Sequence, residues 1–338
     1  MPGLTPSEID ALFAPLEFYE KLGLAVSGGP DSLALMLLAA QWASGPGEHP
    51  KLYVYTVDHR LRPEAAGEAA MVVREAEAIG LPVRSLRWEG DKPATGIQAA
   101  ARIARYRLIA EAMEQDGVAI LATAHHLADQ AETVLMRLAH GSGIEGLRGM
   151  DRLSLVEGCE VVRPLLGVRP EVLREVVSAA GLSPAVDPSN LDQDYERVRW
   201  RLMLPALDAM GLTLERLQTF ARRMDEAGTL IRSAAEAAYP ELVVPISATE
   251  VEVAHNGFTR LDPPVATLLL GQVLGVVDGD RQSPSLGALE LLSRRLQHFD
   301  PMKAVTLHGC VVSSDEKIIR VRKEGPRKAA LKAAAASA

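Results

Sequence analysis

The pattern of apolar and polar positions in the first half of the chain predicts strands that alternate with helices. Short apolar runs typical of buried strands occur at 22–26, 51–57, 82–88 and 118–124. Between them lie amphipathic stretches, of which the longest, 95–116, repeats its apolar residues at helical spacing. Strands that alternate with helices predict an α/β fold with a doubly wound parallel sheet.

The alternation stops at about residue 195. Beyond it the pattern predicts helices at 199–207, 213–239, 261–274 and 285–298, a hairpin at 243–253, and short strands at 304–307, 310–313 and 317–321. We therefore predict three parts: a nucleotide-binding catalytic domain at 1–194, a mainly helical substrate domain at 195–326, and a disordered, alanine-rich tail at 327–338.

Composition adds the class of protein and its compartment. The chain has 338 residues, of which 48% are hydrophobic and 24% charged, as in ordinary globular proteins with two or three domains. The longest apolar run, 33–40, is too short to span a bilayer, and the first residues do not read as a signal peptide. The only cysteines, Cys159 and Cys310, form no Cys-x-x-Cys motif, which favours a cytoplasmic protein without a disulfide framework.

Charge leaves an RNA partner open. The net charge of −8 argues mildly against a nucleic-acid partner, but net charge is a poor guide when charges are segregated, and we expect neither a DNA nor a membrane partner. Basic residues nevertheless cluster at 197–201, 216–223 and 317–328. Each cluster taken alone is more typical of a solvated surface than of a binding site.

The segment after the first predicted strand carries the strongest chemical signal. Its residues are Ser27, Gly28, Gly29, Pro30, Asp31 and Ser32, and an apolar helix follows. A strand, a glycine turn and a helix N-terminus together form an anion site, because unpaired backbone N–H groups and the helix dipole converge there. Glycines also let phosphate oxygens approach the backbone.

Two other interpretations of this turn remain open. It can be an ordinary tight turn, or, since Ala25–Gly29 nearly fits Gly-x-Ser-x-Gly, a nucleophile elbow. No Gly-x-x-x-x-Gly-Lys-Ser/Thr motif occurs, so the lysine that grips β- and γ-phosphates is missing. A phosphate cradle that holds a carboxylate instead suits pyrophosphate and a metal ion.

Polar clusters follow three of the predicted strands: Ser27–Ser32, Asp58–Arg62 and His125–Glu132. In doubly wound sheets, ligands bind at the carboxyl ends of the strands, so we expect the three clusters to converge. His125 and His126 do not predict a zinc site, because adjacent residues at a strand end point to opposite faces.

The segment 27–32 resembles the PP-loop of the ATP pyrophosphatase group, whose members cleave ATP between the α- and β-phosphates. Further motifs resemble those of the tRNA(Ile)-lysidine synthases and occur in the same order. They are residues 57–63, 101–106, 124–133, 141–150, 163–166 and 187–190, and then the arginines at 197–201. The resemblance is specific over about residues 20–207 and implies an adenine nucleotide alpha hydrolase-like fold.

This resemblance implies a carbon–nitrogen ligase that acts in two steps. ATP first adenylates O2 of the wobble cytidine of an isoleucine tRNA with a CAU anticodon, and pyrophosphate leaves. The ε-amine of free L-lysine then displaces AMP at C2. It further implies that ATP is bound by the whole segment 27–32 together with Arg102 and Arg105, for which a solvated helix face is the alternative.

The resemblance also assigns roles to acidic and basic residues. Asp31 would place Mg²⁺, and Asp129 would handle either the metal or the ammonium group of lysine. Glu132, one helical turn further, would share that work or, alternatively, form a capping box at the helix start. The tRNA would be bound by Arg197, Arg199 and Arg201.

Two positions depart from the family pattern. Ala128 stands where the family usually has a first aspartate, and His140 where an arginine commonly precedes Gly-Ser-Gly. We also expect the chain to lack the extra C-terminal domain of longer relatives, which should limit contact with the tRNA acceptor end. Either the work falls on Asp129 alone or the reaction is slower or altered.

Other functions remain as alternatives. A PP-loop tRNA thiolase acting on cytidine or uridine would share the phosphate loop, but it needs cysteines to carry sulfur or an iron–sulfur cluster, and Cys159 and Cys310 are far apart. A non-catalytic RNA-binding protein on a decayed ATPase scaffold is the alternative that Ala128 suggests.

Overall fold

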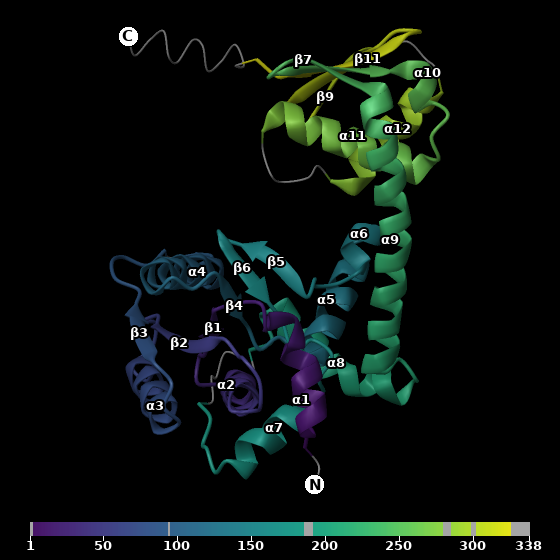
Figure 1. Ribbon diagram of the computed structural model, residues 1–338. Coiled ribbons are helices and arrows are strands. Elements are labelled where there is room, and N and C mark those ends of the chain that lie inside the picture. The colour runs from purple at the N-terminus through teal and green to yellow at the C-terminus, as the bar shows by residue number, and fades with distance from the viewer. Residues whose placement is uncertain (1–2, 94, 186–191, 280–284, 299–301, 326–338) are drawn as a thin grey trace, which may run out of the picture. The chain divides into compact units, whose positions relative to one another are not determined.

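The structure is a computed structural model that describes residues 3–93, 95–185, 192–279, 285–298 and 302–325. The chain forms two compact units (Figure 1). The first takes in 1–140 and 148–221, and the second takes in 141–147 and 222–338.

A six-stranded sheet forms the centre of the first unit, with the strand order β3-β2-β1-β4-β6-β5. All neighbouring strands are parallel except β5 and β6, which form an antiparallel hairpin at one edge. The strands are β1 (Lys21–Ala25), β2 (Lys51–Asp58), β3 (Val83–Arg87), β4 (Ile120–Ala122), β5 (Leu153–Val156) and β6 (Cys159–Val162). The expected doubly wound parallel sheet is confirmed. The short edge strand β5 is not among the strands that the sequence pattern predicts.

Helices cover both faces of this sheet (Figure 1). One face packs on α1 (Pro6–Phe13), α2 (Pro30–Ala43), α3 (Ala65–Ala78) and α7 (Pro170–Ala179), in a core that includes Phe13, Leu35 and Trp42. The other face packs on α4 (Ile97–Asp116) through Tyr106, Ile109 and Met113. Residues buried on both faces explain why β1 and β4 read as continuous apolar runs rather than as alternating ones.

Two more helices belong to the first unit. They are α5 (Leu127–Ala139) and α8 (Glu196–Ala209), which pack against each other and against the start of α9 (Leu214–Leu242). The short 3₁₀ helix η1 (Ala14–Leu16) extends the leading helix, which Thr5 caps.

The second unit consists of a five-stranded antiparallel sheet, several helices and the part of α9 from Arg222 on. The strand order is β7-β8-β11-β10-β9. The strands are β7 (Val243–Ser247), β8 (Glu250–Ala254), β9 (Met302–Leu307), β10 (Cys310–Ser314) and β11 (Ile318–Lys323). The helices are α6 (Ile144–Leu147), α10 (His255–Phe258), α11 (Pro263–Asp278) and α12 (Leu286–Gln297). The predicted hairpin and the predicted short strands thus join in one sheet, whose apolar face covers Leu269, Leu270 and Leu274 of α11.

The compact units and the expected domains divide the chain differently. We expected a boundary after residue 194, but α8 belongs to the first unit because Trp200, Leu204 and Leu207 pack with α5 and α9. The expected tail at 327–338 and the turn at 187–190 lie outside the described residues. None of the helices within the described ranges is long and apolar enough to cross a membrane.

Gly23 lies in β1, in the middle of the sheet, where a side chain has no room. A Cβ atom there would lie 3.0 Å from Tyr55 and 3.2 Å from Leu121. We expect Gly23→Ala to destabilise the first unit by about 1–3 kcal/mol, because overpacking shifts β2 and β4. Urea unfolding followed by tryptophan fluorescence measures this unit alone, since all three tryptophans (42, 88 and 200) belong to it.

Gly67→Ala serves as the matched control. Gly67 lies in α3, and nothing would meet its Cβ within 4 Å. The substitution should leave the midpoint unchanged or raise it, by up to about 1 kcal/mol. Equal destabilisation by both substitutions would contradict the packing argument.

Candidate active site

The turn between β1 and α2 forms a compact loop held by its own hydroxyl groups. The Ser27 backbone N–H donates to Ser32 Oγ at 3.1 Å, and Ser32 Oγ donates to the Gly29 carbonyl at 3.0 Å. Gly28 has φ +88°, a left-handed conformation that favours glycine, and a Cβ there would lie 3.1 Å from Met71. Glycine at position 28 thus follows from backbone geometry as well as from ligand access.

The N-terminus of α2 is open for an anion. Gly29 is the N-cap, and no side chain caps the helix. A Cβ on Gly29 would meet only Ser27 Oγ, at 3.7 Å, so this side of the loop is open. Pro30 occupies the first helical position, where its missing N–H costs nothing. The first backbone N–H groups of a 14-residue helix therefore face outward together with its dipole.

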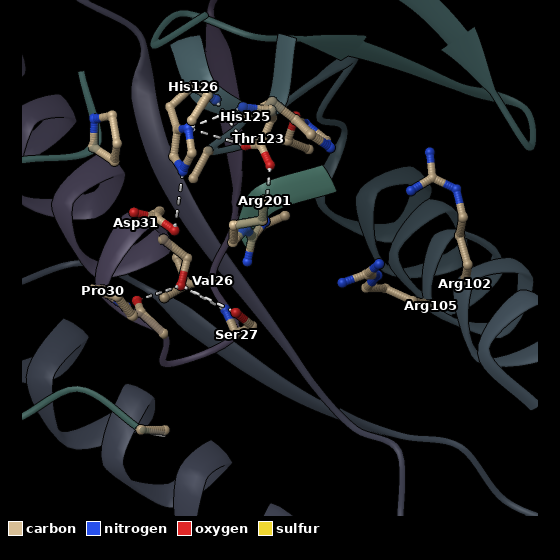
Figure 2. Close-up of a pocket in the computed structure, with 18 of the residues that line it drawn as sticks. Val26, Ser27, Pro30, Asp31, Arg102, Arg105, Thr123, His125, His126 and Arg201 are labelled. Atoms are coloured by element: carbon tan, nitrogen blue, oxygen red, sulfur yellow. Dashed lines mark hydrogen bonds and ion pairs between the residues drawn. The ribbon is translucent and has the colours of Figure 1, made fainter. Parts of the chain in front are cut away.

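This loop opens into a cavity of about 1100 Å³ within the first unit. Its wall includes Ser27 and residues 29–32 after β1, His59 after β2, and His125, His126, Ala128 and Asp129 after β4 (Figure 2 shows the two adjacent histidines with the loop). Arg201 from α8 and Arg102 and Arg105 from α4 also line it. The predicted convergence of the three strand ends is confirmed.

His126 connects the carboxylates of two of these strand ends. Its Nε2 lies 3.5 Å from Asp31 Oδ2, and its Nδ1 lies 3.4 Å from Asp129 Oδ2. Burial would lower the pKa of His126, but the hydrogen bond with Asp31 and the charge of Asp129 raise it above its ordinary value. The imidazole therefore lies between the two carboxylates, and Figure 2 shows its contact with Asp31.

Asp129 stays ionised in this surrounding. Burial would raise the pKa of Asp129, yet its interactions with His126, Arg197 and His125 and the hydrogen bond from the His126 backbone lower it below its ordinary value. The guanidinium groups of Arg197 and Arg201 lie 3.7 Å and 3.6 Å from its Oδ1. Asp129 is thus a fixed negative charge at the cavity wall rather than a group that readily takes a proton.

Glu132 is fully buried and is bound by two arginines of α8. Arg197 Nε donates to its Oε2 at 2.8 Å, and Arg201 Nε donates to its Oε1 at 2.6 Å. The exposed fraction of the Glu132 side chain is 0%, whereas those of the two arginines are 39% and 42%. The capping-box alternative for Glu132 is wrong, because Asp129 and His126 form that box.

Arg199 points elsewhere on α8. It is exposed, and its Nη1 donates to the carbonyl oxygens of Gln193 and Asp194 at 2.8 Å and 3.0 Å. Arginines two residues apart on a helix point in different directions, so the structure brings Arg197 and Arg201 together and leaves Arg199 apart from them.

Arg102 and Arg105 of α4 point into the cavity (Figure 2). Within the described residues neither forms an ion pair, and the buried Nε of Arg105 has no hydrogen-bond partner. Burial is the main influence on Arg105 and lowers its pKa. Two guanidinium groups without a carboxylate partner, opposite a helix N-terminus, form a wall suited to phosphate oxygens.

The two departures from the family pattern have different surroundings. Ala128 is buried and lines the cavity, so no carboxylate extends from that position. His140 follows α5, and its Nε2 lies 3.0 Å from Glu196 Oε1 at the start of α8. His140 therefore connects the same two helices as Glu132 does.

Sequence analysis placed His59, His125 and His126 in the clusters expected to converge but assigned none of them a role in the site. His59 directly follows β2, and His126 is the N-cap of α5, with His125 just before it. Burial lowers the pKa of both His59 and His125 to about 4, so these two imidazoles are neutral at physiological pH.

The residues present fit Mg²⁺ in one particular mode. No group of three or more potential metal ligands occurs in the part of the chain that the structure describes. Mg²⁺ needs only one or two carboxylates when substrate phosphates supply the other oxygens. Asp31 meets this requirement, since it begins α2 beside the phosphate loop and keeps 37% of its side chain exposed.

We expect Glu132→Gln to destabilise the first unit by about 1–3 kcal/mol. Both carboxylate oxygens accept hydrogen bonds from guanidinium groups, so the amide –NH₂ of glutamine would meet a donor. Urea unfolding followed by tryptophan fluorescence measures the change.

Glu89→Gln is the matched control, because Glu89 pairs with Arg60 at the surface, where both side chains are more than half exposed. This variant should stay within about 0.5 kcal/mol of the wild type. A Glu132→Gln variant as stable as Glu89→Gln would refute the structural role of the buried carboxylate.

Comparison with known proteins agrees with this geometry. The PP-loop domain family matches residues 5–207. A tRNA(Ile)-lysidine synthase of Bradyrhizobium sp. (strain BTAi1 / ATCC BAA-1182) is 39% identical, and the match covers 96% of each chain. A tRNA(Ile)-lysidine synthase of Rhodopseudomonas palustris is 44% identical over 87% of this chain and 85% of the relative.

Among solved structures, the U34-tRNA thiolase NcsA from Methanococcus maripaludis has a similar fold. The TM-score is 0.55 at 14% sequence identity, and the match covers 65% of this chain and 78% of the thiolase. That likeness concerns the fold alone. The relatives and the matched domain establish the family: this chain belongs to the tRNA(Ile)-lysidine synthases, within the PP-loop proteins.

Proposed function

We propose that the chain is an ATP-dependent carbon–nitrogen ligase that joins free L-lysine to C2 of the wobble cytidine of tRNA(Ile) with a CAU anticodon. In the first step cytidine O2 attacks the α-phosphorus of ATP, and pyrophosphate leaves. In the second the lysine ammonium group loses a proton to solvent, and the neutral ε-amine attacks C2. The C2–O2 bond breaks, and AMP leaves with the former O2 atom.

One observation carries this proposal: a single cavity is lined by the anion cradle, by the carboxylates of Asp31 and Asp129, and by Arg102 and Arg105, which form no ion pair within the described residues. The open N-terminus of α2 and the hydroxyl groups of Ser27 and Ser32 suit the departing pyrophosphate. Arg102 and Arg105 face the cavity from the other side and suit the remaining phosphate charge. Such preorganised donors stabilise the charge that develops when a phosphate leaves.

Asp31 is the residue that would hold Mg²⁺. When bound, the metal would neutralise phosphate charge and orient the leaving group. His126 positions the Asp31 carboxylate through its Nε2.

Asp129 suits the ammonium group of lysine. Its pKa is lowered, so it offers a negative charge and does not act as the proton acceptor. The lysine side chain binds as an ammonium ion and reacts as a neutral amine. A fixed carboxylate at this place orients both forms. Glu132 contributes indirectly, because it holds the arginines whose guanidinium groups flank Asp129.

The three arginines of α8 that we propose for tRNA binding differ in their interactions within the protein. Arg199 is exposed and bound only to backbone oxygens, which leaves its charge available for a phosphate. Arg197 and Arg201 form ion pairs with Glu132, so a phosphate that contacts them shares them with that carboxylate.

A thiolase activity is not favoured by the site. Both cysteines of the chain are buried, and neither lines the cavity. Burial raises the pKa of Cys159 and raises that of Cys310 to about 11, so neither is a reactive thiolate.

The decisive experiment is mass spectrometry of CAU-anticodon tRNA(Ile) after incubation with ATP, Mg²⁺ and lysine. We expect the mass of one lysine less one water to be added, and AMP and pyrophosphate to be released in equal amounts. Asp31→Ala should reduce pyrophosphate release by at least a hundredfold, because metal and phosphate would lose their carboxylate partner. Asp10→Ala, at an exposed position of α1, is the matched control.

Release of ADP, or a product that depends on a sulfur donor, would overturn the proposed reaction. A wild-type protein that binds tRNA without turning over ATP would instead support the non-catalytic RNA-binding alternative.

Arg199→Ala should weaken tRNA binding and lower the slope of log K against log salt by about one, because one phosphate contact is lost. ATP binding should not change. Arg199→Lys, which keeps the charge, should restore the slope. If Arg199→Ala weakens ATP binding as much as tRNA binding, the residue has a structural role instead.

A further inference from the structure

His125 lines the cavity at the end of β4, and the proposed chemistry leaves it without a role. Its Nδ1 lies 2.9 Å from Thr123 Oγ1, which in turn lies 3.5 Å from the carbonyl oxygen of Val162 on β6. Thr123 is buried, so its hydroxyl group has these two partners and not bulk water.

Only one tautomer of His125 makes both of these contacts hydrogen bonds. In that tautomer the Thr123 hydroxyl donates to the Val162 carbonyl, which can only accept, and its oxygen accepts from His125 Nδ1–H. A neutral imidazole carries one proton, and Nε2 is then left with a lone pair. This Nε2 has no hydrogen-bond partner within the described ranges of the chain.

The surrounding charge keeps the imidazole neutral and selects what can bind to it. Burial lowers the pKa of His125 to about 4, Asp129 opposes this only in part, and Arg163, Arg197 and Arg102 lower it further. The same three guanidinium groups disfavour a second cation at Nε2, so a lysine ammonium group is better placed at Asp129. An uncharged N–H donor fits Nε2.

Resting on the proposed function, we propose that His125 Nε2 accepts a hydrogen bond from the exocyclic N4 amino group of the wobble cytosine and so selects cytosine over uracil. O2 and N4 lie at the two ends of the same base edge, so a base read at N4 leaves O2 free for the α-phosphorus. Uracil carries an acceptor, O4, in place of N4, and would meet the Nε2 lone pair. A site built to bind an N–H group rejects the analogue that lacks it.

Thr123 is the positioning residue of this contact. Its hydroxyl group fixes the proton on Nδ1 and thereby the acceptor on Nε2. Without it, the ring can place the proton on Nε2 and present a donor instead.

The contact is tested by a double-mutant cycle, in which one change is made in the enzyme and the other in the substrate. Pyrophosphate release is measured as kcat/KM with two versions of the CAU-anticodon tRNA, one with cytidine at the wobble position and one with pyrimidin-2-one ribonucleoside, which lacks N4. Loss of the amino group also changes the nucleophilicity of O2. This effect is the same for the wild type and its variants, so it cancels in the cycle. We expect wild type to lose about tenfold more activity on removal of N4 than His125→Ala loses.

Thr123→Val is the second variant, because it keeps His125 and changes only the hydroxyl group. We expect it to bring the cost of N4 removal closer to that in His125→Ala, which a merely structural role of Thr123 would not do. Tryptophan fluorescence shows whether each variant is folded, and Thr123→Val provides the test if His125→Ala is not.

The outcomes separate the two proposals. A wild type that releases no pyrophosphate with the cytidine tRNA overturns the proposed function. An active wild type with the same cost of N4 removal in all three enzymes overturns the role of His125. A rise in KM for ATP or for lysine in His125→Ala, with no change in the cycle, overturns it as well, because the acceptor would then serve adenine or the amine.

Discussion

The architecture of the candidate site depends on one buried negative charge. Glu132 has no exposure to solvent, and a carboxylate in such a place is stable only when it is paired and hydrogen-bonded. Its partners are Arg197 and Arg201 of α8, so α8 must lie against α5 for the charge to be satisfied. The apolar contacts of Trp200 and Leu204 with the same region support this arrangement.

This pairing has chemical consequences at the cavity wall. The guanidinium groups that satisfy Glu132 also flank Asp129 and help to keep it ionised. Asp129 in turn caps α5 together with His126, and His126 reaches Asp31 at the phosphate loop. A chain of charged contacts thus extends from α8 to the start of α2, and each member restricts the position of the next. Preorganisation of this kind is what phosphate and amine chemistry require.

His125 and His126 are adjacent in the chain but differ in their surroundings. His126 lies between two carboxylates, which raise its pKa, whereas burial and the charges of three arginines keep His125 neutral. Two adjacent residues of the same type therefore present opposite chemistry to one cavity.

The sequence by itself determined the α/β alternation, the phosphate loop and the convergence of the three strand ends, because these follow from local periodicity and from a rule about parallel sheets. It also placed the second unit's strands, although not their union in one sheet. Only the tertiary structure decided which polar residues are partners. Arg197, Arg199 and Arg201 look alike in sequence, but α8 turns two of them toward Glu132 and one toward solvent. The physical reason is that burial and pairing arise between α5 and α8, some 65 residues apart, and no local pattern encodes that distance.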